Sequence, residues 1–387
     1  MNSRTRLLTA LGGGEPDRLP VTTHHLMPYF LTTYLNGMSE SEFFGRFGLD
    51  PITWVWDLTP EESHGEFSMV VDEGMAGEGN RWMCADDWRI EASRLPHTRN
   101  KATRYDIVTP SGTLTTVLEE RSQTVWVVER LIKRKSDIEL IAKHAVSPSC
   151  DVETVNRKAG ALHDRGILRG AVPGFEIYGQ PGCWQDAAVL VGIVELIEAT
   201  FEDPVWVHEL LGILRDRKLE SIESMAGARL DVIELGGGDA SSTVISPTIF
   251  TEFVAPYDAQ LIAALHRVGQ RVVYHTCGGM MPILELIADM HPDAMETFTP
   301  PTLGGDVDLA EAKRRIGDRV CMIGGFDQCS YLAGCTPDET RRAVRKCFAE
   351  AGAGGGYILA PSDHFFDADV ALIQAFAEEA RSCVYGG

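Results

Sequence analysis

The chain has 387 residues, of which 44% are hydrophobic and 24% are charged, as in ordinary globular proteins. Its formal net charge of −21 repels phosphate backbones and anionic membrane surfaces, which excludes nucleic acid and membranes as expected partners. The sequence has no apolar run near the ~18 residues that a membrane span needs, and its start has no secretory apolar core. Nine cysteines without a CxxC pair fit a reducing compartment, so we expect a cytoplasmic protein.

The first part of the chain contains two weak strands and then an antiparallel segment. Leu19–Thr23 and Ile52–Trp56 flank a helix predicted to start at Ser39, where Glu42 completes a capping box. Between Arg81 and Arg130 the pattern becomes antiparallel. The strands predicted there are Trp88–Glu91, Tyr105–Thr109 and Thr113–Leu118, with a hairpin turn at Pro110-Ser111-Gly112. We expect residues 81–130 to be an insertion over one end of the main domain.

From about residue 165 onward, apolar strands without polar alternation follow one another with helices between them, which indicates a parallel sheet. These strands are Ile167–Val172, Leu230–Leu235, Arg271–Tyr274, Ala294–Phe298, Val320–Ile323 and Tyr357–Ala360. The two early strands raise the number to about eight, which closes a barrel. An open doubly wound sheet is the alternative, but no GxGxxG follows an early strand. We therefore predict an α/β fold: one (β/α)₈ TIM-type barrel over residues 1–387, with the antiparallel hairpin inserted at 81–130.

Polar side chains follow or end each predicted strand from Leu230–Leu235 onward. Barrel enzymes place their chemistry at the carboxyl ends of the strands, so this rim is the predicted site. The residues concerned are Asp239, His275, Cys277, Glu296, Asp327, Gln328, Asp363 and His364.

His275 and Cys277 are the most specific pair at this rim. Residues i and i+2 leaving a strand point to the same side, so an imidazole and a thiolate can reach one ion. Zn²⁺ favours nitrogen and sulfur ligands and keeps an open position in catalytic sites. The alternative is a buried structural cysteine beside a hydrogen-bonded core histidine.

The chain resembles the uroporphyrinogen decarboxylase-like superfamily, and within it the cobamide-dependent methyltransferases. The segments that carry the resemblance are Arg4–Leu11, Pro16–Val21, Ser246-Pro247 with Phe250 and Pro256, His275–Gly278, Gly324–Asp327 and Gly355–Ile358. Their order spans nearly the whole chain and is more specific than any one segment. The resemblance implies a (β/α)₈ barrel with its site at the carboxyl ends of the strands.

In the methyltransferase branch, zinc is held by the His and Cys that match His275 and Cys277, and by a cysteine after the last strand. This chain has Asp363 and His364 there instead, so we predict that one of them is the third ligand. Glu296 is predicted to be a metal ligand or the acceptor for His275. The resemblance implies a zinc-dependent transfer of methyl between a small methylated compound, or a thiol or folate acceptor, and a corrinoid. That methylcobalamin-type corrinoid would sit on a partner protein, and a homodimer is compatible with this interpretation.

The decarboxylase branch gives the alternative function, a lyase acting on a small carboxylic acid. Gly48-Leu49-Asp50 leading to Asp57 is similar to the segment that ends in the decarboxylase catalytic aspartate, so Asp57 is a candidate catalytic carboxylate. The arginine-rich segment that grips porphyrin carboxylates in that family is replaced here by His24–Tyr29, which has no arginine. Porphyrinogen itself is therefore a poor expected substrate.

The remaining rim residues have a functional and a structural interpretation. Asp239 orients a ligand or closes a glycine turn, and Asp327 is catalytic or caps a helix. The expected substrate contacts are His24, Trp54, Tyr178 and Gln328. Aromatic residues of this kind, Trp56 included, are more often core, although a quaternary amine or an aryl ether would use their ring faces.

Overall fold

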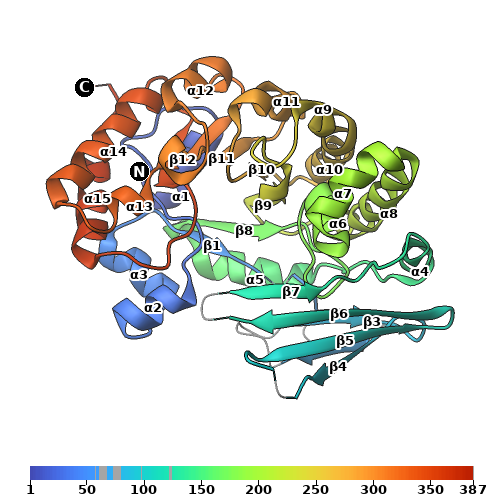
Figure 1. Ribbon diagram of the computed structural model, residues 1–387. Helices are drawn as coiled ribbons and strands as arrows, with labels where there is room; N and C mark the ends of the chain where they lie inside the picture. Colours follow the sequence, from blue (N-terminus) through green and yellow to red (C-terminus); the bar gives the residue numbers. More distant parts are fainter. Residues whose placement is uncertain (57, 61–67, 73–79, 97, 122–123, 387) are drawn as a thin grey trace.

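The computed structural model describes the chain except residues 57, 61–67, 73–79, 97, 122–123 and 387. Its centre is a parallel sheet of seven strands in the order β1-β8-β9-β10-β11-β12-β13, with each neighbouring pair parallel. The strands are β1 (Ile52–Trp54), β8 (Ile167–Ala171), β9 (Val232–Gly236), β10 (Val272–His275), β11 (Ala294–Thr297), β12 (Cys321–Phe326) and β13 (Tyr357–Pro361). The sheet curls into a barrel with helices around its outside (Figure 1).

The segment predicted as the first strand lies between the two ends of this sheet. Val21 forms a parallel bridge with Leu359 of β13, and the backbone nitrogen of Thr22 donates to the Leu359 carbonyl at 2.9 Å. On its other side, the Val21 carbonyl accepts from the backbone nitrogen of Asp50, just before β1, at 2.7 Å. The predicted barrel is therefore confirmed, with Leu19–Thr23 as a short bridging segment instead of a regular strand.

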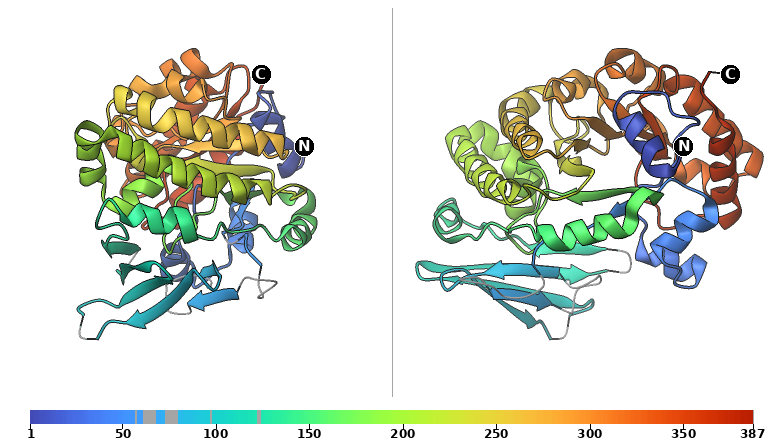
Figure 2. Two further views of the ribbon diagram at one scale, coloured as in Figure 1. Left: turned by 90° about the vertical axis from the view of Figure 1, so that its right-hand side faces the viewer. Right: turned by 180° about the vertical axis from the view of Figure 1, so that it is seen from behind.

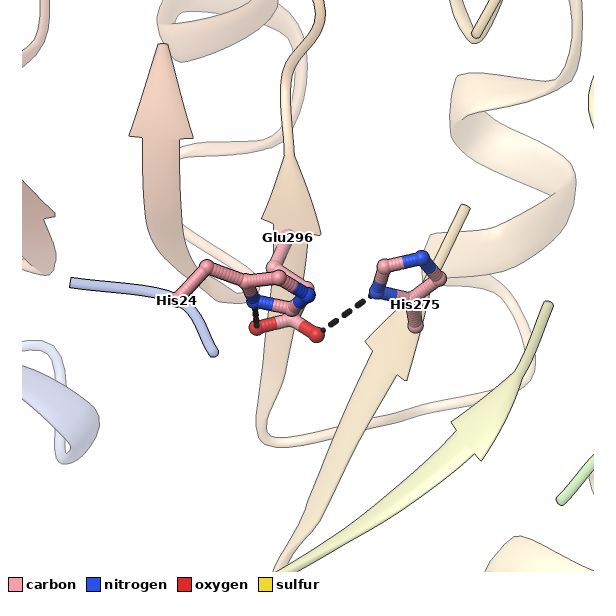
Figure 3. A group of neighbouring side chains, drawn as sticks. All are labelled: His24, His275 and Glu296. Atoms are coloured by element: carbon pink, nitrogen blue, oxygen red, sulfur yellow. Dashed lines mark hydrogen bonds and ion pairs between the residues drawn. The ribbon is translucent and has the colours of Figure 1, made fainter. Parts of the chain in front are cut away.

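The barrel interior has an apolar layer below a polar layer. The lower layer is a cluster of strand residues packed against α1 (Ser3–Leu11), which lies across the amino-terminal end of the barrel. Its members include Leu7, Ala10, Leu11, Ile52, Ile167, Val232, Val273, Ala294, Cys321 and Ile358. Because side chains alternate along a strand, residues two positions further on face the same interior. Those residues are Trp54, Arg169, Glu234, His275 and Glu296, the last two of which are drawn in Figure 3.

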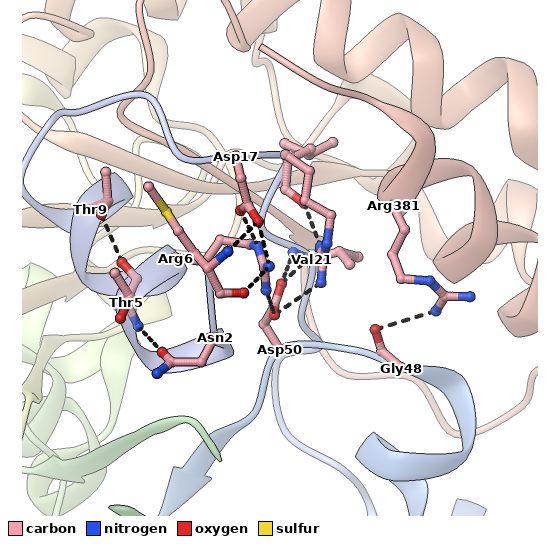
Figure 4. Close-up of polar contacts among 12 residues, drawn as sticks. Asn2, Thr5, Arg6, Thr9, Asp17, Val21, Gly48, Asp50 and Arg381 are labelled. Atoms are coloured by element: carbon pink, nitrogen blue, oxygen red, sulfur yellow. Dashed lines mark hydrogen bonds and ion pairs between the residues drawn. The ribbon is translucent and has the colours of Figure 1, made fainter. Parts of the chain in front are cut away.

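A buried ion network closes the amino-terminal end of the barrel (Figure 4). The Asp50 carboxylate, fully buried, accepts from Arg6 at 2.7 Å, twice from Arg18 at 3.1 Å, and from the Val21 backbone nitrogen at 3.1 Å. Arg6 also donates to Asp17 at 2.8 and 3.0 Å, and this hydrogen bonding holds the pKa of Asp17 well below its usual range. The network fixes the segment around Val21, which has too few backbone bonds to be held as a strand.

The predicted antiparallel region is larger than its expected bounds. It forms a two-stranded and a four-stranded sheet, which lie along one side of the barrel beyond α5 (Val152–Leu162) in every view (Figures 1 and 2). The strands are β2 (Ser68–Asp72), β3 (Asn80–Cys84), β4 (Arg89–Arg94), β5 (Ala102–Thr109), β6 (Gly112–Glu120) and β7 (Val125–Glu129). The start expected at residue 81 was too late, because β2 pairs with β3. The larger sheet contacts the loop after β8, where the rings of Trp88 and Phe175 are 5.9 Å apart.

The remaining helices follow the strands around the barrel. They are α2 (Pro28–Leu35), α3 (Glu40–Phe47), α4 (Asp137–His144), α6 (Cys183–Val191), α7 (Ile193–Glu202), α8 (Pro204–Glu223), α9 (Pro247–Ile249), α10 (Ala255–Arg267), α11 (Leu284–Ala288), α12 (Leu309–Ile316), α13 (Gln328–Tyr331), α14 (Pro337–Ala351) and α15 (Val370–Ser382). The capping box predicted at Ser39 and Glu42 is present at the start of α3. Within the described residues, no helix is both long and apolar enough to cross a bilayer.

Candidate active site

Arg169 of β8 organises the polar layer of the barrel. It donates to both oxygens of Glu296 at 2.8 and 2.5 Å, and it also donates to Glu234. Arg169 and Glu296 are 3% and 2% exposed, so this ion pairing takes place out of contact with water. Burial alone would raise the pKa of Glu296, but the neighbouring Arg169 charge lowers it well below its usual range. Glu296 is therefore an anion.

His275 contacts Glu296 from the neighbouring strand β10 (Figure 3). Its Nδ1 is 2.9 Å from a Glu296 oxygen, and because an ionised carboxylate only accepts, Nδ1 must carry the proton. With the Nδ1 proton held by Glu296, Nε2 is the nitrogen that gains a free lone pair when the imidazolium loses its second proton, as it must to bind a metal. Cys277 acts on the pKa of this imidazole, but it does not belong to the group of close ligand atoms that His275 forms with His24 and Glu296. Burial alone would lower the pKa of His275, but the contacts with Cys277 and Glu296 raise it well above its usual range.

His24 completes a group of possible metal ligands with His275 and Glu296. One ligand atom from each of the three lies within 4.8 Å of the others. His24 Nδ1 is 3.8 Å from Glu296, and its ring stacks with that of His275 at 5.2 Å between centroids. Burial lowers the pKa of His24, so its imidazole is neutral, the form in which histidine binds a metal.

The two residues predicted for the third ligand lie next to this group without belonging to it. An Asp363 oxygen is 3.9 Å from His24 Nε2 and 2.8 Å from His364 Nδ1. The His364 ring packs edge-on against Phe366 at 5.0 Å. The same Asp363 oxygen therefore faces both His24 and His364, and the His364 ring lies parallel to His25 at 6.3 Å.

Aromatic rings continue from His24 toward the surface. His25 stacks on His24 at 4.1 Å, and its ring stands perpendicular to Trp54 and Trp56 at 4.4 and 4.7 Å. Trp54 and Trp56 stack on each other at 4.2 Å with their planes 2° apart. Arg169 lies over Trp54 at 4.2 Å from the ring centre, so Trp54 links the polar layer to these rings.

Asp239 and Asp327 hold the backbone at the rim. Asp239 accepts from the Gln185 side chain at 3.0 Å, and its own backbone nitrogen donates back to Gln185 at 2.7 Å. Asp327 accepts from the Ser330 backbone nitrogen at 2.8 Å, as the cap of α13, and from Thr302 at 2.6 Å. Both carboxylates thus have the structural partners of the alternative interpretation.

Two predicted substrate contacts also have protein partners, and one predicted catalytic residue cannot be placed. The Gln328 side chain accepts from the Ser362 backbone nitrogen at 3.1 Å, which joins the ends of β12 and β13. Tyr178 donates to the Val125 carbonyl at 3.4 Å, in contact with β7. Asp57 lies outside the described residues.

Sequence reasoning missed Arg169 and Glu234, the residues that hold Glu296 in place. Both stand inside predicted strands whose neighbours are apolar. A charged residue at an interior position of a buried strand must find a partner, and that conflict was the available signal. His25 was also passed over in favour of His24.

The chain matches the family model described as uroporphyrinogen decarboxylase (URO-D) over residues 106–383, more than half of its length. It belongs to the uroporphyrinogen decarboxylase family. The family's enzyme from Psychromonas ingrahamii is 30% identical over 206 residues, which cover 50% of this chain and 53% of that one. The enzyme from Pseudoalteromonas translucida is 30% identical over 245 residues, 60% of this chain and 63% of the relative. The chain thus matches less than two thirds of the length of these relatives.

A solved structure of a methyltransferase from Methanosarcina mazei has the same fold. The two structures align with a TM-score of 0.62 over 99% of each chain, at 15% sequence identity. This likeness shows that the two proteins share their fold over nearly their whole length.

Proposed function

We propose that the protein is a zinc-dependent methyltransferase that moves a methyl group between a small methylated compound and a corrinoid on a separate protein. The observation that carries the proposal is His275, with its Nδ1 proton bound to an anionic Glu296 and Cys277 beside the ring. A carboxylate that fixes the tautomer of a metal-ligating histidine is the common support of zinc sites. The donor types of these residues fit zinc.

His275 and Cys277 would supply two ligands, and the structure offers two candidates for a third. His24 lies in one group of ligand atoms with His275 and Glu296, and Asp363 contacts His24. Bound there, zinc would act as a Lewis acid on the group attached to the methyl, or lower the pKa of a thiol or hydroxyl acceptor. Arg169 and Glu234 would keep Glu296 ionised and in register with His275.

A reduced corrinoid on the partner protein would supply the electron pair that accepts the methyl group. The substrate heteroatom would keep the electron pair of its broken bond to carbon and take up a proton. The barrel contributes position, since it holds the methylated compound beside the ligand cluster.

A lyase activity on a small carboxylic acid is the second candidate, because the similar curated relatives are named uroporphyrinogen decarboxylase. A substrate with many carboxylates needs several fixed cations. Arg6, Arg18 and Arg169 are each bound to carboxylates of the protein itself. These three arginines therefore offer no uncommitted charge to a substrate with many carboxylates, which disfavours porphyrinogen as the substrate of a lyase.

Metal analysis and a spectroscopic assay test the proposal together. We expect one zinc per chain in the wild type, lost in His275→Ala and Cys277→Ala, and retained in the controls His266→Ala and Cys335→Ala. With small methylated compounds, the wild type should convert a Co(I) corrinoid to its methylated form, and the first two variants should lose at least ~10²-fold in rate. A metal-free wild type that decarboxylates an acid, and that loses this activity in Asp57→Ala, would contradict the proposal.

A further inference from the structure

Arg169, Trp54 and Trp56 form a stack of planar groups, and Trp56 is its exposed end. Ile52 lies in the barrel interior, so Trp54 and Trp56, two and four positions later, continue on that side of the chain. Arg169 covers one face of Trp54, and Trp56 covers the other. Trp56 itself is 65% exposed, which is unusual for the largest apolar side chain. The stack therefore presents one flat aromatic face to a ligand.

His25, which stands against both tryptophans, has a polar atom without a partner. Its Nε2 is buried and makes no hydrogen bond to any described residue. A buried nitrogen of this kind costs free energy unless something bonds to it. The missing partner is expected from a molecule that lies beside Trp54 and Trp56, because the other ring neighbours of His25 are His24 and His364, which stack with it.

The single exposed face of Trp56 and the unbonded Nε2 of His25 distinguish between the ligands that use aromatic faces. A quaternary ammonium group is bound by several faces that surround the cation, and it has neither a donor nor an acceptor for His25. A planar ring with a hydroxyl substituent stacks on a single flat face, and the hydroxyl can donate to or accept from an imidazole nitrogen in either tautomer. Arg169 already occupies the cation site over Trp54. The geometry therefore favours a neutral aromatic ring that carries oxygen.

We propose that the protein binds an aryl methyl ether, with its ring stacked on Trp56 and an oxygen substituent bonded to His25 Nε2. This inference rests on the proposed methyltransferase function, for which the ether would be the methyl donor. From this position the substrate reaches toward His275 along the row of imidazoles, since His25 stacks on His24 and His24 on His275. The products are the corresponding phenol and the methylated corrinoid, with the proton taken up by the phenolic oxygen.

Binding of small probes to the full-length, zinc-loaded protein tests the site without requiring turnover. The probes are 2-methoxyphenol and tetramethylammonium, measured by titration calorimetry. We expect the wild type to bind 2-methoxyphenol and not tetramethylammonium. Trp56→Leu should weaken this binding about tenfold and His25→Leu about fivefold, from the loss of stacking and of one hydrogen bond. The matched control is Trp126→Leu, since Trp126 is also exposed, at 53%, but lies on β7. It should change binding less than about twofold.

The outcomes separate this inference from the function on which it rests. Unchanged affinity in both Trp56→Leu and His25→Leu, or preference for tetramethylammonium, would overturn the aryl ether site. If 2-methoxyphenol binds as expected but never methylates a Co(I) corrinoid, the ring site stands and the methyltransferase proposal fails. Because Trp56 is mostly exposed, its replacement should leave the unfolding transition unchanged, and a folded variant with weakened binding supports the site.

Discussion

The two ends of the barrel each bury arginine among carboxylates, but they use the arrangement differently. At the amino-terminal end, the oxygens of Asp50 accept four hydrogen bonds, from Arg6, Arg18 and the Val21 backbone. At the carboxyl end, Glu296 accepts from Arg169 on one side and faces His275 and His24 on the other. Asp50 thus bonds only to arginines and backbone in the first network, whereas Glu296 in the second also contacts two imidazoles.

The buried ion pairs at Asp50 and at Glu296 therefore contribute different properties to the protein. Buried pairs rarely increase stability over well-packed apolar residues, because desolvation offsets their attraction. At Asp50 the benefit is geometrical, since the network holds a chain segment that the backbone alone secures weakly. At Glu296 the benefit is chemical, since the paired carboxylate fixes the proton of His275 on Nδ1.

Replacing Arg169 with methionine should have the largest effect, because it affects both stability and the site. Glu234 and Glu296 would be left buried without their cation, at a cost of about 3–5 kcal/mol in the free energy of unfolding. Glu296 would then take up a proton and release His275, so zinc affinity should fall by at least ~10-fold. Urea unfolding and competition with a zinc chelator measure the two effects. Arg169→Lys should recover part of both, and normal zinc affinity in Arg169→Met would contradict this role.

Replacing Asp50 with alanine should cost somewhat less, about 3 kcal/mol, and should leave the site intact. Arg18 would lose its carboxylate, while Arg6 would keep Asp17. The measurement is the free energy of unfolding in urea, with zinc content determined per folded molecule. We expect full zinc occupancy, unlike in Arg169→Met. Loss of zinc in a folded Asp50→Ala protein would show that the two ends of the barrel are coupled, and it would contradict the separate roles of the two networks.

The barrel could be predicted from the sequence because parallel strands are apolar along their whole length and alternate with capped helices. Leu230–Leu235 and Ala294–Phe298 were located within two residues for this reason. The segment Leu19–Thr23 was harder, since its place depends on Asp50, a residue far along the chain. The two-stranded sheet of β2 and β3 was missed, because its pairing joins strands separated by a segment without a sequence pattern.

The site could be predicted only in part. His275, Cys277 and Glu296 were recognisable, since strand ends mark the rim and a family resemblance names the ligands. The partners of Asp239 and Asp327 were not, because Gln185 and Thr302 come from other elements. Arg169 lies 127 residues from Glu296, and no local pattern joins two such positions. Such interior charges become neighbours only when the barrel closes.

Glu176 is a buried carboxyl without a cation of its own, unlike Asp50 and Glu296, which are paired with arginines. Burial, with a smaller contribution from Asp186, raises the pKa of Glu176 to about 8. Lys218, the nearby cation, is 2.8 Å from Asp186. The native state therefore holds a proton that the unfolded chain, with its carboxyl near pKa 4.5, releases. The stability from this proton is present below pH 4.5 and is lost as the pH rises toward 8.

The variant Glu176→Gln should therefore gain stability over the wild type as the pH rises. We expect the two proteins to differ little near pH 5, and the variant to be more stable by at least ~1 kcal/mol at pH 8. Urea unfolding at both pH values provides the measurement. Glu209→Gln, at an exposed position on α8, is the control and should show no such trend. A difference that stays constant between pH 5 and pH 8 would contradict a protonated Glu176.

The smallest effect is expected at the edge of the amino-terminal end, where Arg4 pairs with Asp231 at 2.5 and 2.7 Å. The Arg4 side chain is 35% exposed, so water and salt screen its charge. Asp231 also accepts from the Leu168 backbone nitrogen at 2.9 Å, and this bond remains when Arg4 is removed. Arg4→Ala should thus lower the free energy of unfolding by less than about 1 kcal/mol, and by less still in 0.5 M salt. Arg6→Ala, which strips a fully buried carboxylate of one of its two arginines, should cost more and respond less to salt. If Arg4→Ala costs as much as Arg6→Ala, the stability of this end comes from total charge and the closed network around Asp50 has no special part in it.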